Sequence, residues 1–190
     1  MADEPMEGKT QTMLVPDNTM MLLIDVQIAL LRVMHHKDEL VQNLAKLLRG
    51  LRVLEVPILC TEQNPKGLGA TIPELAPLLG EPPLEKLAFS CCGEAHFTEA
   101  LEKFDRRQVI VAGIESHVCV YQTTMDLLDA GYGVQIVADA VSSRAAENKR
   151  IALERMAAAG ASITSVEMVL FELLQDASGP KFKEILKIVK

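Results

Sequence analysis

Short apolar runs alternate with amphipathic helical segments along the chain. The first run, TMMLLIDV at 19–26, is apolar almost throughout, which is typical of a parallel strand covered on both faces. Leucines then recur at helical spacing, with charged residues between them, and predict an amphipathic helix over 37–56 that ends near Pro57. A buried strand followed by such a helix is the first half of a βαβ unit.

The same alternation continues to the end of the pattern. Apolar runs at 57–61, 108–113, 133–140 and 161–164 predict further strands, and helices are predicted over 95–104, 118–131, 144–160 and 166–174. Gly131 and Gly160 stand where C-terminal caps are expected, and Thr164 with Glu167 forms a T-x-x-E capping box. The pattern predicts an α/β fold: a parallel β-sheet of about six strands flanked by helices on both faces, a Rossmann-like three-layer α/β/α arrangement.

One region departs from the alternation. Residues 62–86 are rich in proline and glycine and too long for an ordinary connection. Long connections of this kind often line a functional site, so we expect this one to shape a crevice.

Composition narrows the class of partner. The 190 residues fit a single domain over 16–190, preceded by a flexible leader at 1–15. A formal charge of -7 argues against nucleic acid and anionic membrane as partners, and favours a small-molecule substrate. Apolar residues make up 49% of the chain, which leaves room for a homo-oligomer interface. No apolar run approaches the ~20 residues of a membrane span, and the start of the chain lacks a signal-peptide pattern. The four cysteines are expected to be reduced. We therefore predict a cytoplasmic protein.

Candidate chemistry lies where the predicted strands end, because open α/β sheets bind ligands at the carboxyl ends of their strands. The first strand ends at Asp25, the second leads to Gln63, and Cys119 follows the strand that ends at Gly113. Cys119 falls at the start of a predicted helix, where the helix dipole would lower the thiol pKa. The alternatives stay open here: a buried structural cysteine, and an aspartate that caps the next helix.

A lysine completes the candidate set. Lys86 heads the apolar segment LEKLAFS after the irregular region, and it either snorkels at the surface or points into the crevice. His117 lies two residues before Cys119, a spacing at which helical side chains do not face each other, so we do not expect a Cys-His pair.

The motifs LLIDVQ, LEKLAFS and VIVAGIESHVCVYQTTMDLLDAGYGVQIVADAVSSR, in this order, resemble the isochorismatase-like cysteine hydrolase family. TEQNPKGLGATIPEL further resembles its subgroup of isochorismatase domain-containing proteins. The resemblance implies a catalytic triad of Asp25 as base, Lys86 and the nucleophile Cys119. It also implies a cis peptide at Ile114-Glu115 and an oxyanion hole from the backbone N–H groups of Glu115 and Cys119.

Four residues in or beside these motifs are candidate substrate-binding residues: Gln27, Gln63, Phe89 and Ile114. Family members that hold a metal do so with an aspartate and histidines after the second strand, where this chain has Gln63, Asn64 and Pro65, so we predict no metal and no cofactor. The family members that cleave the vinyl ether of isochorismate lack the cysteine that this chain has as Cys119, so isochorismate is not the expected substrate. The resemblance therefore implies hydrolysis of a small amide or related acyl compound through a thioester, and the alternative is a non-catalytic binding or scaffold protein that retains the pocket.

Overall fold

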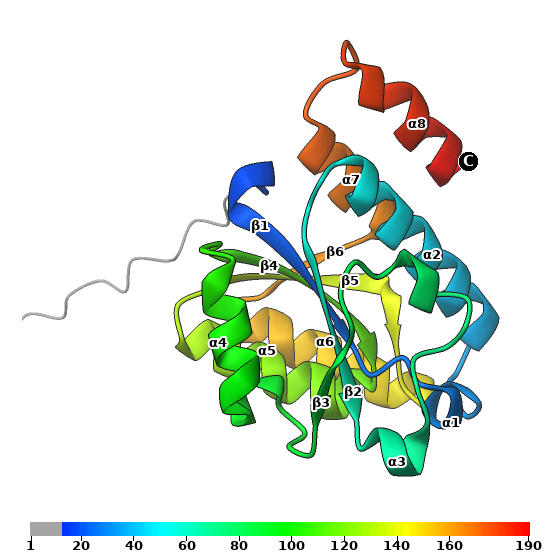
Figure 1. Ribbon diagram of the computed structural model, residues 1–190, viewed down its shortest axis with the longest axis vertical. Helices are drawn as coiled ribbons and strands as arrows, with labels where there is room; N and C mark the ends of the chain where they lie inside the picture. Colours follow the sequence, from blue (N-terminus) through cyan, green and yellow to red (C-terminus); the bar gives the residue numbers. More distant parts are fainter. Residues whose placement is uncertain (1–12) are drawn as a thin grey trace, which may run out of the picture.

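Figure 1 shows the computed structural model, which describes residues 13–190 as three layers, with helices on both faces of a central sheet. The strands are β1 (Thr19–Ile24), β2 (Ile58–Gln63), β3 (Leu84–Lys86), β4 (Gln108–Ile114), β5 (Gly133–Ser142) and β6 (Ser162–Thr164). The α-helices are α1 (Ile28–Leu31), α2 (Lys37–Val53), α3 (Pro65–Leu68), α4 (Ala95–Lys103), α5 (Tyr121–Asp129), α6 (Ala146–Ala158), α7 (Val166–Leu174) and α8 (Pro180–Val189). Short helical turns are η1 (Pro16–Asn18), η2 (Ala76–Leu78), η3 (Cys91–Gly93) and η4 (Ser116–Val120).

The sheet has six strands in the order β3-β2-β1-β4-β5-β6, and every pair is parallel. Chain order reverses between β1 and β4, so a crevice is expected outside the carboxyl ends of these two strands. Helices α2 and α7 lie on one face, with α8 packed against these two helices, and α4, α5 and α6 lie on the other (Figure 1). The fold class predicted from the sequence is confirmed.

The core centres on β1 and β4, in which every residue is buried. The leucines on one stripe of α2 are buried, as the sequence pattern predicted, and α2 packs against β5. Two-sided burial explains why these strands are apolar throughout instead of alternating.

Two local predictions need correction, and a third is confirmed. The helix predicted over 118–131 is divided: a π-helical turn, η4, precedes α5, and Cys119 lies in that turn. The residue that caps α7 is Ser165, whose hydroxyl accepts from the N–H of Met168, and not Thr164. Gly131 does follow α5 with a φ of 83°, as expected of a C-terminal cap.

Most of the predicted leader, residues 1–12, lies outside the described residues. Its last residues, 13–15, run along the body of the protein: the N–H of Leu14 donates to Glu172 Oε1 (2.6 Å), and that of Val15 to Gln108 Oε1 (2.8 Å). Leu14 is buried.

The pairing of β4 with β5 is irregular. Val111 pairs with Ile136, but Gly113 pairs with Val141, so β5 contains three more residues than β4 between the two pairs. An insertion of this kind bends a strand and turns its side chains in new directions. The consequence here is an opening beside α2, described below.

Candidate active site

Asp25 follows β1 directly and is fully buried. Its backbone has a φ of 53°, in the left-handed region, and its N–H donates to the Thr61 carbonyl (3.2 Å) at the end of β2. The carboxylate accepts a hydrogen bond at Oδ1 from the Thr61 hydroxyl (2.8 Å). The helix that follows, α1, has Gln27 at its N-cap and no side-chain cap, so the capping alternative for Asp25 is excluded.

Gly113, in β4, allows β4 to pack closely against the end of β1. It pairs with Ile24 and has a φ of 120°. A Cβ at residue 113 would lie 2.1 Å from the Ile24 carbonyl oxygen. Glycine therefore lets β4 approach β1 at the point where the chain turns to present Asp25.

Lys86 points into the crevice, because its ammonium lies 2.7 Å from Asp25 Oδ2 and both side chains are buried. The same Nζ donates to Gln63 Oε1 (2.7 Å) and to the carbonyls of Ala88 and Phe89 (3.2 Å each). Burial alone would lower the pKa of Lys86, but the Asp25 carboxylate and two nearby thiols outweigh it, and the pKa is raised. The snorkelling alternative does not apply.

The third member, Cys119, is 5% exposed and lies against the Asp25 carboxylate, which affects it through space and through a hydrogen bond. Burial is the largest cause that raises the pKa of Cys119 to about 12, Asp25 adds to it, and Lys86 opposes it. The sequence suggested a lowered pKa from a helix dipole. That expectation is wrong, because the sulfur is buried in η4 beside a carboxylate. In the resting site Cys119 is a neutral thiol in contact with a carboxylate.

A second thiol belongs to the same cluster. Cys91, in η3, is fully buried, lies 3.8 Å from the Thr61 hydroxyl, and is affected by the charges of Lys86 and Asp25. Burial raises its pKa to about 11. Local sequence does not indicate this placement, because Cys91 follows the motif that contains Lys86 in a stretch without periodicity.

The segment after β4 is fixed from two sides. The Ile114-Glu115 peptide bond is cis, and the Glu115 carbonyl accepts from the N–H groups of Val118 (3.0 Å) and Val120 (3.2 Å). The Glu115 carboxylate accepts from both the backbone N–H (3.0 Å) and the side chain (3.1 Å) of Arg144. These contacts hold the chain between β4 and Cys119 at the carboxyl edge of the sheet.

His117 does not serve the thiol. Its Nδ1 lies 3.0 Å from the Ser143 hydroxyl, and its Nε2 lies 3.4 Å from the Asn148 side chain. The histidine thus joins η4 to the loop before α6.

The four candidate substrate-binding residues lie at the same edge but differ in exposure. Gln27 is buried, and its amide bonds to the backbone of Gln63 and Gly69. Gln63 holds Lys86 and the Leu87 carbonyl. The Phe89 side chain is 56% exposed, and Ile114 is buried. Their contact with a substrate stays a prediction.

Within residues 13–190, no group of three or more His, Cys, Asp or Glu side chains could hold a metal ion. Glu62, an acidic residue near the end of β2, accepts from the Thr71 N–H (2.6 Å) and hydroxyl (2.8 Å). A search of the same residues finds no helix both long and apolar enough to cross a bilayer.

The isochorismatase domain matches residues 19–168. Isochorismatase domain-containing protein 2 of Macaca fascicularis is 40% identical over 176 residues, which cover 93% of this chain and 85% of the relative. The secreted isochorismatase effector Isc1 of Phytophthora sojae is 37% identical over 184 residues, with 93% of this chain and 87% of the relative covered.

Solved structures of similar proteins have the same fold. MAR1 ribonuclease from Caenorhabditis elegans has a TM-score of 0.88 at 37% identity, with 94% of this chain and 92% of that chain covered. YcaC from Pseudomonas aeruginosa, solved with covalent acrylamide, has a TM-score of 0.89 at 27% identity and the same coverage. YcaC from Escherichia coli, described as an octameric hydrolase of unknown specificity, shares the fold, with a TM-score of 0.89 at 23% identity and with 95% of this chain and 92% of that chain covered.

Proposed function

We propose that this chain, which belongs to the isochorismatase family, is a cysteine-dependent hydrolase of a small amide or related acyl compound. The observation that carries the proposal is the buried Asp25–Lys86 ion pair, with Oδ2 2.7 Å from Nζ, lying against the Cys119 thiol. Burying a charged pair is costly, and a structural thiol needs no such neighbour. A nucleophile needs both a proton acceptor and a charge partner.

In the first step, the Cys119 sulfur attacks the substrate carbonyl carbon while its proton passes to Asp25. The thiol is the form present before attack, because its pKa is about 12. Oδ1 is engaged by Thr61, whereas Oδ2 has the Lys86 ammonium beside it and, within the described part of the chain, no hydrogen-bond partner. We therefore assign Oδ2 as the atom that accepts the proton.

The tetrahedral intermediate then collapses. Backbone N–H groups of Glu115 and Cys119 would hold its oxyanion, each contributing about 3 kcal/mol in comparable sites. Asp25 returns the proton to the leaving nitrogen, the C–N bond breaks, and a thioester remains on Cys119. Water, deprotonated by Asp25, attacks the thioester, which releases the carboxylic acid and restores the thiol.

Lys86 keeps the site's charge in balance through these steps. Its four close oxygen partners fix the ammonium between Asp25 and the loop after β3. When the carboxylate is neutralised by the thiol proton, the negative charge moves to the substrate oxygen, and the ammonium stays to stabilise it. Phe89, which is exposed, is proposed to contact the substrate from the rim, and Gln27 and Gln63 to support the site through their contacts with the backbone and with Lys86.

The proposed setting is a cytoplasmic homo-oligomer. Reduced cysteines throughout the described residues support the compartment, and an octameric relative of the same fold supports the assembly. Another relative carries the name of a ribonuclease, but the net charge of -7 gives this chain little attraction for RNA.

The test is covalent trapping. The protein is incubated with acrylamide and a panel of small amides, imides and carbamoyl compounds, with an RNA oligonucleotide as a further arm, and analysed by intact mass and peptide mapping. We expect an adduct on Cys119 that Cys119→Ala lacks and that the matched variant Cys91→Ala retains. An adduct that maps to Cys91, or no adduct and no turnover with any compound, would reject the hydrolase and favour a binding protein.

A further inference from the structure

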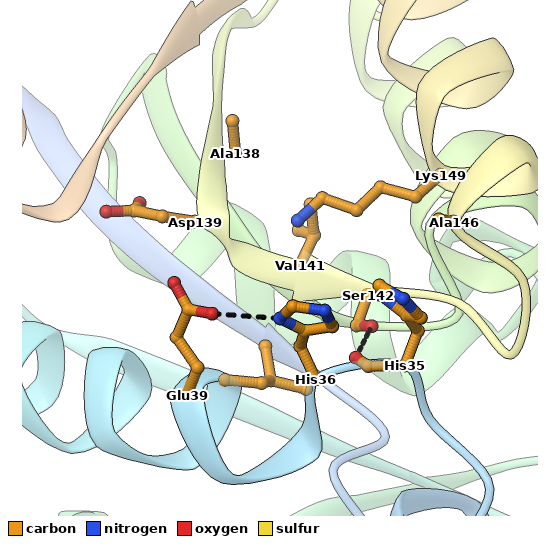
Figure 2. Close-up of a pocket in the computed structure, with 10 residues that line it drawn as sticks. His35, His36, Glu39, Ala138, Asp139, Val141, Ser142, Ala146 and Lys149 are labelled. Carbon is orange, nitrogen blue, oxygen red and sulfur yellow. Dashed lines mark hydrogen bonds and ion pairs between the residues drawn. The ribbon is translucent and has the colours of Figure 1, made fainter.

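A cavity separate from the candidate active site lies at the irregular part of β5, between the start of α2 and the first turns of α6 (Figure 2). Its volume is about 440 Å³, enough for a small organic molecule. Its wall comes from three places: the start of α2 with His35, His36 and Glu39, the inserted stretch of β5 with Ala138 and Asp139, and the first turns of α6 with Lys149. Cys119 is not among its lining residues.

Lys149 distinguishes this cavity from an ordinary surface hollow. Its side chain extends from α6 into the opening (Figure 2), and it is partly buried. Across the described residues its ammonium makes no hydrogen bond and no ion pair. Burial lowers the pKa of Lys149, and the more distant Asp139 and Glu39 carboxylates oppose the shift without cancelling it. The ammonium is thus partly desolvated without a contacting counter-ion.

The two carboxylates that border the cavity are already engaged. Glu39 Oε2 lies 3.2 Å from His36 Nδ1, and Figure 2 shows this contact on the α2 side. Asp139 Oδ1 accepts from the Val166 N–H (2.9 Å), and its carboxylate is turned away from Lys149 in Figure 2. Neither carboxylate forms an ion pair with Lys149.

The walls are held in place independently of any ligand. The Ser142 hydroxyl donates to the His35 carbonyl (2.7 Å), and the His35 N–H donates to the Ser143 carbonyl (3.0 Å), so the end of β5 is fastened to the segment before α2. The rings of His35 and His36 lie 4.0 Å apart and form one side of the opening. A preformed cavity of this kind loses little entropy when it binds a ligand.

We propose that this cavity is a binding site for a small organic monocarboxylate, with the Lys149 ammonium as counter-ion and the imidazole rings of His35 and His36 as the part of the wall that contacts the organic group. A carboxylate supplies the one contact that Lys149 lacks. A phosphate dianion fits less well, because Glu39 and Asp139 would repel the second charge. The proposal is independent of the hydrolase chemistry at Cys119.

The test uses 4-fluorobenzoate as the probe, with ¹⁹F NMR line broadening of the probe on titration with the full chain. The neutral 4-fluorobenzyl alcohol has the same ring and no charge. We expect saturable binding of the benzoate and at least fivefold weaker binding of the alcohol. Lys149→Met and Lys149→Gln should each weaken benzoate binding at least fivefold, and Lys149→Arg, which keeps the charge, should retain most of it.

The matched control is Lys103→Met, which removes an exposed lysine from the end of α4 and should leave benzoate binding unchanged. Circular dichroism of each variant verifies folding. Benzoate binding that survives in both Lys149→Met and Lys149→Gln would overturn the proposal, and so would equal binding of the alcohol. Loss of binding after acrylamide blocks Cys119, with Lys149→Met unaffected, would place the probe in the other site and would also overturn it.

Discussion

Replacing Asp25 with asparagine is expected to make Cys119 more reactive toward iodoacetamide and to abolish turnover. The two effects have opposite directions because Asp25 has two roles in the site. In the resting protein its charge and its hydrogen bond hold the proton on the thiol, and during the reaction it must accept that proton. Asparagine removes both roles and leaves the Lys86 ammonium, which lowers the pKa of Cys119.

The magnitude follows from the pKa of Cys119, which is raised from 9.0 to about 12. Below pH 9, three units reduce the thiolate population by about 1,000-fold, because each unit is tenfold. Burial is the largest cause of the shift and remains in the variant, so only part of this factor returns. We expect alkylation of Cys119 to accelerate roughly 10- to 100-fold, and turnover to fall by about 10²–10⁴, as is usual when a general base is lost.

The assay is a time course of iodoacetamide labelling at pH 8 with peptide mass spectrometry. Cys92, in η3, serves as an internal reference in the same sample, because burial is the largest cause that raises its pKa to about 12 and Asp25 is not among the groups that shift it. Asp129→Asn is the matched variant, because Asp129 is exposed at the end of α5. Unchanged or slower labelling of Cys119 in Asp25→Asn would refute the assignment of Asp25 as the group that holds the thiol proton.

Three further predictions concern stability. Lys86→Met leaves the Asp25 carboxylate buried without its partner and should lower the free energy of unfolding, measured with urea, by about 3–5 kcal/mol. The double variant with Asp25→Asn should recover part of that loss. Equal stability of the single and double variants would contradict the buried pair. Gly113→Ala places a Cβ 2.1 Å from the carbonyl that ends β1 and should destabilise by at least about 3 kcal/mol, whereas Gly131→Ala, with a positive φ but nothing within 4 Å, should cost only about 1 kcal/mol by the same measurement. Burial raises the pKa of Cys60 from 9.0 to about 12, so between these pH values the folded state binds more protons than the unfolded state. The contribution of Cys60 to the free energy of unfolding is therefore full below pH 9 and should fall by about 1.4 kcal/mol per pH unit above it. Cys60→Ala should flatten that slope in unfolding series at pH 8 to 10.

The sheet could be predicted because its central strands carry an unambiguous signal. Every residue of β1 and β4 is buried, and an unbroken apolar run is what two-sided burial produces. The short strands β3 and β6 have three residues each, and their position depends on pairing with distant segments. β6 lies within the run predicted at 161–164, but β3 was not predicted, because it falls at the end of the region 62–86 that has no periodic pattern.

The sequence predicted Asp25, Lys86 and Cys119 as members of the candidate site, but it did not predict the pKa shift at Cys119. Strand ends pointed to Asp25 and Cys119, but the direction of Lys86 depends on carbonyls of Ala88 and Phe89 that only the folded loop brings together. The sign of the pKa shift at Cys119 depends on burial, which local sequence does not reveal. Cys91 entered the cluster through tertiary packing alone.

The three-residue edge strand β3 gives the site a weak side. Lys86 is its last residue, and among the strands of residues 13–190 only β2 pairs with it. Edge segments can detach transiently while the rest of a protein stays folded, at a free-energy cost below that of global unfolding. Each such excursion would carry the ammonium away and leave Asp25 and Cys119 in place. Inactivation by mild denaturant should therefore precede loss of the fold, and amide hydrogen exchange at 84–86 should be faster than at the centre of the sheet.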